Sequence, residues 1–463
     1  MVFAAPELAP THKGGLMRLL SFGIVAGTLL ATMLCWMPPA QAVVKPGDVI
    51  TKDNAYKVAE LLSPGNYQLV REGMQLRIVP SDKLDWPPPF KTATEKYSPQ
   101  VQLGPDGSLK GYVAGQPFPL VDPNDPQVAT KVMWNYSYRP LYSDDIDMRY
   151  PEVATFARNS IGWPLSYYTV GHFAFYNNIG RIEVPPIPTD PDATRSGLRY
   201  RFGFYPFLEP AALRGYGMVR QRHIDPNVDD NAWVYSPQTR KLSRESAGTL
   251  SDSTGALSAF GVGGGSGFGA GMGGTSGATA YANTLDPDSY FGFSAKIENF
   301  NYRFLGERDM LASVHAVHSP EPQCPNDGGR TICPENWEMR HLYVIEADAK
   351  SRDQTIPRRI FYIDSEGWFI TASDQYDRGG KLWKTIATFN TYRDRPVPDA
   401  RIAIYPYKRM FQLGLVDEDF NTGYSSVVYM PGKTAPDREC WYIDMGTVDN
   451  AFLTPQAMVQ AGH

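Results

Sequence analysis

Residues 218–244 read MVRQRHIDPNVDDNAWVYSPQTRKLSR, and this stretch decides the fold class. Along 218–224 we expect an extended strand, in which Val219, Gln221 and His223 alternate with Met218, Arg220, Arg222 and Ile224 and successive residues point to opposite faces. An extended run resumes at 233–235, and a further one at 240–244 carries basic residues. The separating residues are typical of turns: Pro226, Asn227, Asp229 and Asp230, then Ser236–Thr239. The stretch predicts a three-stranded antiparallel meander and not an active-site loop.

Similar short extended runs recur along most of the chain. Thirty-nine prolines fit irregular connections between strands better than helices. A short helix is expected at 58–62, ending at Pro64–Gly65, because apolar residues there have helical spacing. The expected extended runs are 75–79, 111–114, 131–138, 173–176, 200–204, 300–304, 342–347, 359–364, 368–371 and 384–389.

Composition indicates a globular protein that does not bind nucleic acid. Of the 463 residues, 42% are hydrophobic, and 44 Lys and Arg face 49 Asp and Glu, a formal net charge of -5. No long basic run is interleaved with aromatic residues. A chain of this length can bury roughly three quarters of its unfolded surface. Because no clear linker interrupts the strand-rich segments, we expect one domain over 43–463.

The N-terminus predicts export. Met17–Arg18 precedes an apolar run over 19–37, followed by Pro38–Pro39 and by Ala40–Gln41–Ala42, which fits a signal-peptidase site. Residues 1–42 are therefore expected to be a cleaved signal peptide, with an uncleaved anchor as the alternative. Translation from Met17 would give a more compact signal than translation from Met1.

Three cysteines would remain after cleavage. Cys324 and Cys333 enclose a polar, turn-rich loop at about 320–336, for which an oxidising compartment predicts a local disulfide. The alternative is zinc held by these two cysteines with His315 and His318, although the spacing departs from close CxxC pairing. Cys440 lies beside Trp441 and is expected to be a buried, inert thiol.

A glycine-rich segment covers about 255–285. Its centre, 261–278, reads GVGGGSGFGAGMGGTSGA and lacks the preceding strand and following helix that a phosphate-binding glycine loop requires. We expect a surface loop, because this composition cannot pack a core.

Sequence signatures of catalysis are mostly missing. There is no HExxH, Walker loop or G-x-S-x-G motif. The adjacent acids Asp144–Asp145 and Asp229–Asp230 would point to opposite faces of an extended strand. Two distant carboxyls of a glycosidase remain an open alternative. The sequence therefore predicts no enzyme, no metal and no cofactor; the acid-base group of a rival enzyme would be His223, Asp229 and Asp230.

Aromatic residues in the alternating runs are candidates for a hydrophobic binding surface. From the residues alone they line a cavity or belong to an ordinary core, because large aromatics dominate core packing in any case. The candidates are Phe173, Phe175, Phe202, Phe204, Trp233, Tyr235, Phe300, Tyr302 and Phe304.

Several motifs together resemble a proteobacterial exported family, domain of unknown function 1329, whose members are described as outer-membrane lipoprotein-sorting-like. One is the series Asp229, Asp230, Trp233, Tyr235, Pro237, Arg240 and Arg244. The resemblance spans about residues 45–440, and the glycine-rich and cysteine-bearing loops depart from it as local insertions. The other landmarks are 46–48 with 54–55, 63–65, 93–97, 111–115 with 117–119, 131–135, and 376–378 through 382–383.

The resemblance implies a fold and a function. The family is related to the periplasmic lipoprotein carriers, so the expected fold is mainly β: a large curved antiparallel sheet forming an incomplete, half-open β-barrel with a few covering helices. The expected function is a periplasmic carrier or accessory protein for a hydrophobic small molecule or lipid, and the nine aromatics would line its cavity. The implied partners are a resistance-nodulation-division type exporter and an outer-membrane protein. A structural adaptor and an envelope glycan or lipid hydrolase are the alternatives.

Overall fold

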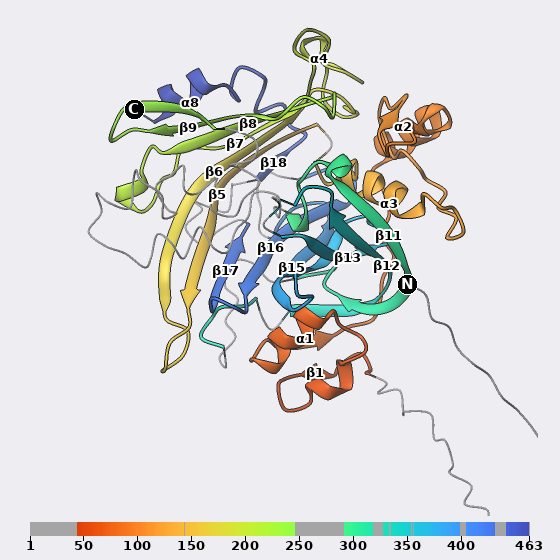
Figure 1. Ribbon diagram of the computed structural model, residues 1–463, viewed down its shortest axis with the longest axis vertical. Helices are drawn as coiled ribbons and strands as arrows, with labels where there is room; N and C mark the ends of the chain where they lie inside the picture. The colour runs from red at the N-terminus through yellow and green to blue at the C-terminus, as the bar shows by residue number, and fades with distance from the viewer. Residues whose placement is uncertain are drawn as a thin grey trace, which may run out of the picture. The chain divides into compact units, whose positions relative to one another are not determined.

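The computed structural model describes residues 44–142, 144–245, 291–317, 327–332, 335–352, 354, 356–398, 404–430 and 441–462 (Figure 1). The expected signal peptide, the glycine-rich loop, Cys324, Cys333 and Cys440 lie outside these residues. Among the described residues, no helix is both long enough and apolar enough to cross a bilayer.

Two antiparallel meanders form most of the body. The first runs through β5 (Asp145–Ala157), β6 (Leu165–Asn177), β7 (Leu198–Phe204), β8 (Gly217–His223), β9 (Asn231–Ser236) and β10 (Lys241–Glu245). Its last three strands are the meander predicted from residues 218–244. The second runs through β11 (Phe300–Ala312), β12 (Glu335–Ala349), β13 (Arg358–Asp364), β14 (Ile370–Tyr376), β15 (Leu382–Arg393), β16 (Arg409–Asp419) and β17 (Tyr424–Tyr429).

Pairing of β17 with β5 joins the two meanders into one sheet. With β1 (Val49–Ile50), β2 (Leu76–Ile78) and β18 (Trp441–Ile443), the sheet has sixteen strands within the described residues. Their order is β1-β2-β12-β13-β14-β15-β16-β17-β5-β6-β7-β8-β9-β10, with β11 also on β12 and β18 also on β5. The strand pairs described here are antiparallel apart from β2 with β12. Two short strands, β3 (Gln102–Leu103) and β4 (Leu109–Lys110), pair separately.

The sheet is curved but does not close. Register shifts interrupt six of the described strand pairs, among them β5 with β6 and β7 with β8, and such bulges bend and twist strands. In the described residues β10 pairs with β9 alone, and no pairing joins it to β11. The expected mainly β fold with a large, half-open antiparallel sheet is confirmed.

The described residues form few helices, and the sequence-based predictions were wrong for two of them. Residues 131–138 were expected to be extended, yet α3 spans Val128–Ser137. Its buried residues recur at helical spacing, and packing on β11 outweighs the strand preference of its aromatic and β-branched residues. Within the described residues, the other helices are α1 (Pro64–Arg71), α2 (Pro88–Tyr97), α4 (Pro191–Ser196) and α8 (Pro455–Ala461), with short 3₁₀ turns at 55–58, 98–100, 140–142, 211–213 and 297–299.

The second misplacement concerns Pro64–Gly65, which begins a helix and does not end one. Pro64 occupies the first turn of α1, where a missing N–H costs nothing, and the Ser63 hydroxyl accepts a hydrogen bond from the Asn66 N–H. The Asp374 carboxylate of β14 accepts hydrogen bonds from the Ser63 hydroxyl and the Gly65 N–H. The start of α1 is thereby fixed to the sheet.

Strands β6–β9 have two differently covered faces. Their inner face, which carries Phe173, Phe175 and Phe202, packs in a core shared with α1, β12, β15 and β16. Their outer face, which carries Ala174, Val219 and Tyr235, is covered by the C-terminal segment with α8 (Figure 1). A further core lies between α3 and β11–β14.

Candidate ligand-binding cavity

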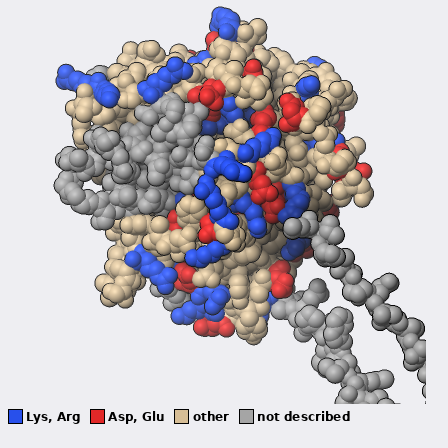
Figure 2. Space-filling model, in the orientation of Figure 1, with Lys and Arg blue, Asp and Glu red and all other residues tan. Residues whose placement is uncertain are grey.

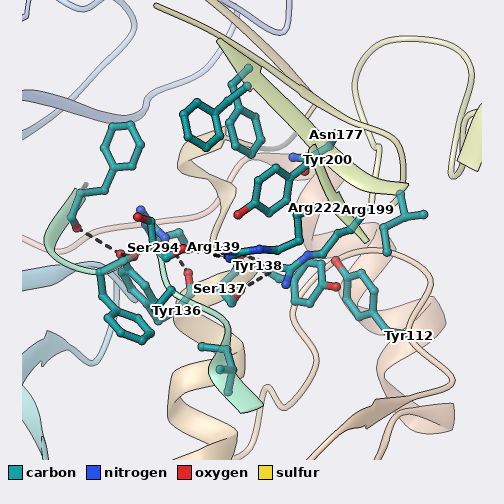
Figure 3. A pocket seen from close by; sticks show the side chains of 18 of the residues that line it. Tyr112, Tyr136, Ser137, Tyr138, Arg139, Asn177, Arg199, Tyr200, Arg222 and Ser294 are labelled. Carbon is teal, nitrogen blue, oxygen red and sulfur yellow. Dashed lines mark hydrogen bonds between the residues drawn. The ribbon is translucent and has the colours of Figure 1, made fainter. Parts of the chain in front are cut away.

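An aromatic cavity lies where the inner face of β6–β8 meets the C-terminal end of α3. Its volume is about 90 Å³, and we call it the inner chamber (Figure 3). By the measure of roughly 10–15 Å³ per water, it has room for about six to nine waters. The wall includes Phe90 of α2, residues 136–139, three strands of the sheet and the segment 291–297.

Strand register brings the aromatic side chains of the chamber together. Phe175 of β6 pairs with Phe202 of β7, so both side chains emerge on the inner face. The rings of Phe173 and Phe202 have centroids 6.2 Å apart, and those of Phe175 and Tyr200 are 4.9 Å apart. Phe291 meets Phe173 edge to face at 5.7 Å. These contacts give the chamber a firm apolar wall.

The segment 291–297 is held to α3 by one tyrosine. The Tyr136 hydroxyl shares its proton between two carbonyl oxygens, that of Phe293 at 2.5 Å and that of Phe291 at 3.1 Å. Burial raises the pKa of Tyr136, which keeps the hydroxyl protonated as a donor. Gly292 has φ +95°, and a side chain there would strike Ile370. The path of this wall is therefore fixed by its neighbours.

Three arginines reach the chamber. Arg139 donates to the Tyr136 carbonyl at 2.8 Å, and Arg222 of β8 donates to the Ser294 carbonyl at 2.9 Å. Arg199 of β7 donates through Nη2 to the Ser137 hydroxyl at 2.7 Å and to the Ser137 carbonyl at 3.3 Å. Figure 3 shows Arg199 and Arg222 extending side by side toward Ser137 and Tyr138. The inner chamber is thus lined by aromatic rings and is bordered by three positively charged side chains.

Arg199 reaches the chamber because of a β-bulge. Leu198 pairs with His223, and the next pairing joins Tyr200 to Arg222, so the register shifts at Arg199. In a regular strand Arg199 would point away from the side chains of Tyr200 and Phe202, because alternate residues face opposite ways. The bulge turns it toward the cavity, as bulges often do at functional sites.

A second cavity of about 200 Å³ adjoins the first, and we call it the outer chamber. Both chambers share Tyr112, Tyr138, Ile179, Arg199 and Arg222 as wall residues. Tyr112 and Tyr138 stack with ring centroids 3.8 Å apart, and the Arg199 guanidinium lies 4.1 Å from the centre of the Tyr138 ring. The stacked rings with Arg199 form a partition between the inner chamber, with its phenylalanine wall, and the outer chamber, whose wall adds Lys296 and Glu298 to apolar residues.

The nine aromatic candidates separate into three groups. Phe173, Phe175 and Phe202 line the inner chamber. Phe204 shares their face but packs on Phe207, with centroids 4.7 Å apart, and over the backbone of Gly171. The other five lie elsewhere: Trp233 and Tyr235 on the outer face beneath α8, and Phe300, Tyr302 and Phe304 in the core between α3 and β11–β14.

Several wall residues were missed from sequence. Tyr136, Ser137 and Tyr138 were hidden because α3 was expected to be a strand. The signal for Arg222 was present, since Arg220 and Arg222 alternate with the outward-facing Val219 and Gln221, but sequence does not tell which face is buried. Arg199 gave no signal, because a bulge depends on the partner strand.

The acid-base candidates do not form a catalytic group. The Asp230 carboxylate is paired with Arg220 at 2.7 Å and Arg222 at 2.9 Å. Although burial opposes its charge, these arginines hold the pKa of Asp230 well below its ordinary value, so it stays ionised. Asp229 is exposed, and His223 Nε2 lies 3.0 Å from Nδ2 of Asn231. Asp230 is thus a structural counter-ion.

Asp144 and Asp145 instead belong to a buried acidic cluster at the start of β5. The Asp144 carboxylate accepts hydrogen bonds from the backbone N–H groups of Ile182, Glu183 and Val184. Burial, and then the nearby charge of Asp444, raises the pKa of both Asp144 and Asp145 to about 7. No cluster of three or more His, Cys, Asp or Glu suited to a metal occurs among the described residues.

A protein-family model matches most of the chain. The model described as "Protein of unknown function (DUF1329)" covers residues 49–260 and 276–433. The chain belongs to the DUF1329 family. The family suggested by the sequence motifs is thereby confirmed, and the break in the match at 261–275 falls inside the glycine-rich segment.

DUF1329 relatives and similar structures come from several bacteria. An uncharacterized protein of Pseudomonas aeruginosa is 21% identical over 408 residues, covering 84% of this chain and 80% of its own. A crystal structure from Vibrio parahaemolyticus, described as a domain of an outer membrane lipoprotein-sorting protein, is 13% identical and has a TM-score of 0.40. The match covers 71% of this chain and 97% of that domain. A DUF1329 family protein of Desulfovibrio piger is 14% identical with a TM-score of 0.39. The match covers 71% of this chain and 96% of that protein.

Proposed function

We propose that this protein is an exported carrier or accessory protein that shelters a hydrophobic ligand, such as a lipid acyl chain, during transport across the bacterial cell envelope. The observation that carries the proposal is the inner chamber, in which Phe173, Phe175 and Phe202 present their rings to an unfilled space. A cavity that aromatic rings line and that the side chains of the protein do not fill is the kind of site that binds a hydrophobic ligand.

The physical basis is the removal of apolar surface from water. Burying an alkyl or ring moiety against the phenylalanine rings gains about 25 cal/mol per Å². The two chambers, of about 90 and 200 Å³, together approach the lower end of the roughly 300–1,000 Å³ common for ligand sites. They would receive one chain end or ring system, while the rest of a larger lipid stays outside.

The alternative functions have less support. A glycan or lipid hydrolase would need a proton donor near the cavity, and Asp230 is committed to two arginines. A structural adaptor of an envelope exporter would need no internal void. An exporter of the resistance-nodulation-division type and an outer-membrane protein remain the partners to which such a carrier would deliver.

The test is to identify what the protein carries when it is purified from the periplasm. Native mass spectrometry, followed by organic extraction, should reveal a stoichiometric hydrophobic molecule. A clean protein that also fails to take up a fluorescent lipid would overturn the carrier proposal and favour the adaptor. Recovery of released sugar or fatty acid after incubation with envelope lipids would favour the hydrolase.

A further inference from the structure

We infer that the ligand is an anionic amphiphile, whose apolar part fills the inner chamber and whose carboxylate or phosphate headgroup is bound by Arg199 and Arg222 where the two chambers meet. This inference rests on the proposed carrier function and adds the chemical class of the ligand. Both arginines line both chambers, so a headgroup between them would sit directly at the end of a chain in the inner chamber (Figure 3).

The charge of the lining is one-sided. Among the described wall residues of the two chambers, Arg139, Arg199, Arg222 and Lys296 are basic, and Glu298 is acidic. Behind this wall, Asp230 is shared by Arg220 and Arg222, with Lys296 3.9 Å away. Arg199 and Arg222 thus bring two positive charges to the margin shared by the chambers, in partly buried surroundings where their field is weakly screened.

Arg199 retains hydrogen-bond donors that the described residues do not use. Within the described chain, its hydrogen bonds go through Nη2 to Ser137 and also to the Tyr138 side chain, and none goes to an acid. Its Nε is buried and has no hydrogen-bond partner there, although a buried donor normally finds one. Guanidinium groups bind carboxylate and phosphate oxygens through paired N–H donors. An anionic headgroup would satisfy the remaining donors of Arg199.

A purely structural role explains only part of this arrangement. Arg139 and Arg199 do satisfy carbonyl oxygens at the C-terminal end of α3, which is a common use of basic side chains. Helix capping, however, requires neither the bulge that redirects Arg199 nor the presence of Arg222 on the same partition. The same partition also stands between the phenylalanine wall of the inner chamber and an outer chamber whose wall includes charged residues. An amphiphile with its chain in the inner chamber and its headgroup at the partition fits this arrangement.

The experiment compares eight-carbon ligands that differ only in the headgroup. Octanoate, octyl phosphate and octanol are titrated against the periplasmic protein loaded with the uncharged fluorescent probe N-phenyl-1-naphthylamine. We expect the two anions to displace the probe at concentrations roughly tenfold to a hundredfold lower than octanol does, and inorganic phosphate to displace none. The Arg199→Gln variant should lose most of this preference, because its affinity for the two anions should fall much more than its affinity for octanol.

Two variants serve as controls. Arg199→Lys keeps the charge and should retain part of the preference for anions, while Arg195→Gln removes an arginine of α4 whose side chain is 76% exposed and should change nothing. Should Arg199→Gln also lose octanol binding, Arg199→Lys decides, since its failure to prefer anions while it binds octanol would refute the headgroup role.

The outcomes separate the two proposals. Equal affinity for octanol and the anions would overturn the headgroup inference and leave the carrier function intact. Displacement by inorganic phosphate as effective as that by octyl phosphate would show a site for the free anion and would also overturn it. No uptake of the probe or of any eight-carbon ligand would remove the carrier function itself.

Discussion

The Arg199 guanidinium donates a hydrogen bond of 2.7 Å to the hydroxyl of Ser137, a residue 62 positions away in the sequence. This contact joins the bulged start of β7 to the last residue of α3, so the strand layer and the helix meet at the margin of the cavity. The partition between the two chambers is built on this contact, since the Tyr138 ring lies directly under the same guanidinium. Substitutions in this part of the protein can separate effects on ligand affinity from effects on folding stability.

Replacing a phenylalanine of the inner chamber by a smaller side chain should weaken ligand binding. Phe175→Leu removes part of the wall, and we expect affinity for a fluorescent lipid to fall by about 1 kcal/mol, or roughly fivefold. The matched control is Phe204→Leu, a phenylalanine of the neighbouring strand on the same face that packs on Phe207 outside the chamber. Titration of the lipid checks both variants. An equal loss of affinity in both would contradict the assignment of the cavity.

Removing the buried counter-ion should destabilise the protein. Asp230→Asn would remove the negative charge that Arg220 and Arg222 both contact in a buried position, and we expect a loss of about 3–5 kcal/mol in the free energy of unfolding. The adjacent and exposed Asp229→Asn should change it by less than about 0.5 kcal/mol. Urea denaturation measures both, and similar stabilities for the two variants would argue against the role of Asp230.

A methyl group at residue 65 should disturb the junction of α1 with the sheet. In Gly65→Ala the new Cβ would overlap the Thr385 side chain and the Asp374 carboxylate, and we expect a loss of about 1–3 kcal/mol. Pro64→Ala, at an exposed position of the same turn, is the comparison and should have a smaller effect. A melting temperature of Gly65→Ala at or above that of Pro64→Ala would show that this junction can adjust.

Stability should depend on the protonation of Asp145. Because burial and the Asp444 charge raise its pKa to about 7 in the folded state, the folded chain holds this proton more tightly than the unfolded chain, whose Asp titrates near 3.8. This group therefore lowers stability as pH rises from about 4 to about 7, by at most about 1.4 kcal/mol per pH unit.

The variant Asp145→Asn removes this titration. Relative to the wild type, its melting temperature should be higher at pH 8 than at pH 5, where Asp145 of the wild type is mostly protonated. Asp53→Asn, at an exposed carboxylate, should show no such pH-dependent difference. A constant offset between Asp145→Asn and the wild type from pH 5 to pH 8 would indicate that Asp145 does not titrate in this range.

Much of the fold was predictable because local patterns determine strands. Alternation along 218–224 and the turn residues after it placed β8, β9 and β10 correctly, and the same pattern found β12 to β15. The pattern failed at 131–138, where apolar residues satisfy both a strand and a helix, and packing on β11 decided for the helix. It also failed at Pro64, whose missing N–H is as compatible with a helix start as with an end.

The candidate site was predictable only in part. Trp233 alternates as regularly as Phe202, yet the two lie on opposite faces, because the register of β7 and β8 carries Phe202 to the face of Arg220 and Trp233 to that of Val219. A period of two shows that a strand has two faces, but not which of them borders a cavity. Here α8, from the far end of the chain, covers the face of Trp233.

The sequence by itself determined the family, the mainly β class and the position of most strands, since these depend on local alternation, turn residues and motif order. Tertiary structure alone decided that Phe173, Phe175 and Phe202 form a wall and that Arg199 joins Arg222 at its margin. The physical reason is that a cavity is made by the register of paired strands, by a bulge and by a helix packed across them. These are relations between segments distant in sequence, and no local pattern encodes them.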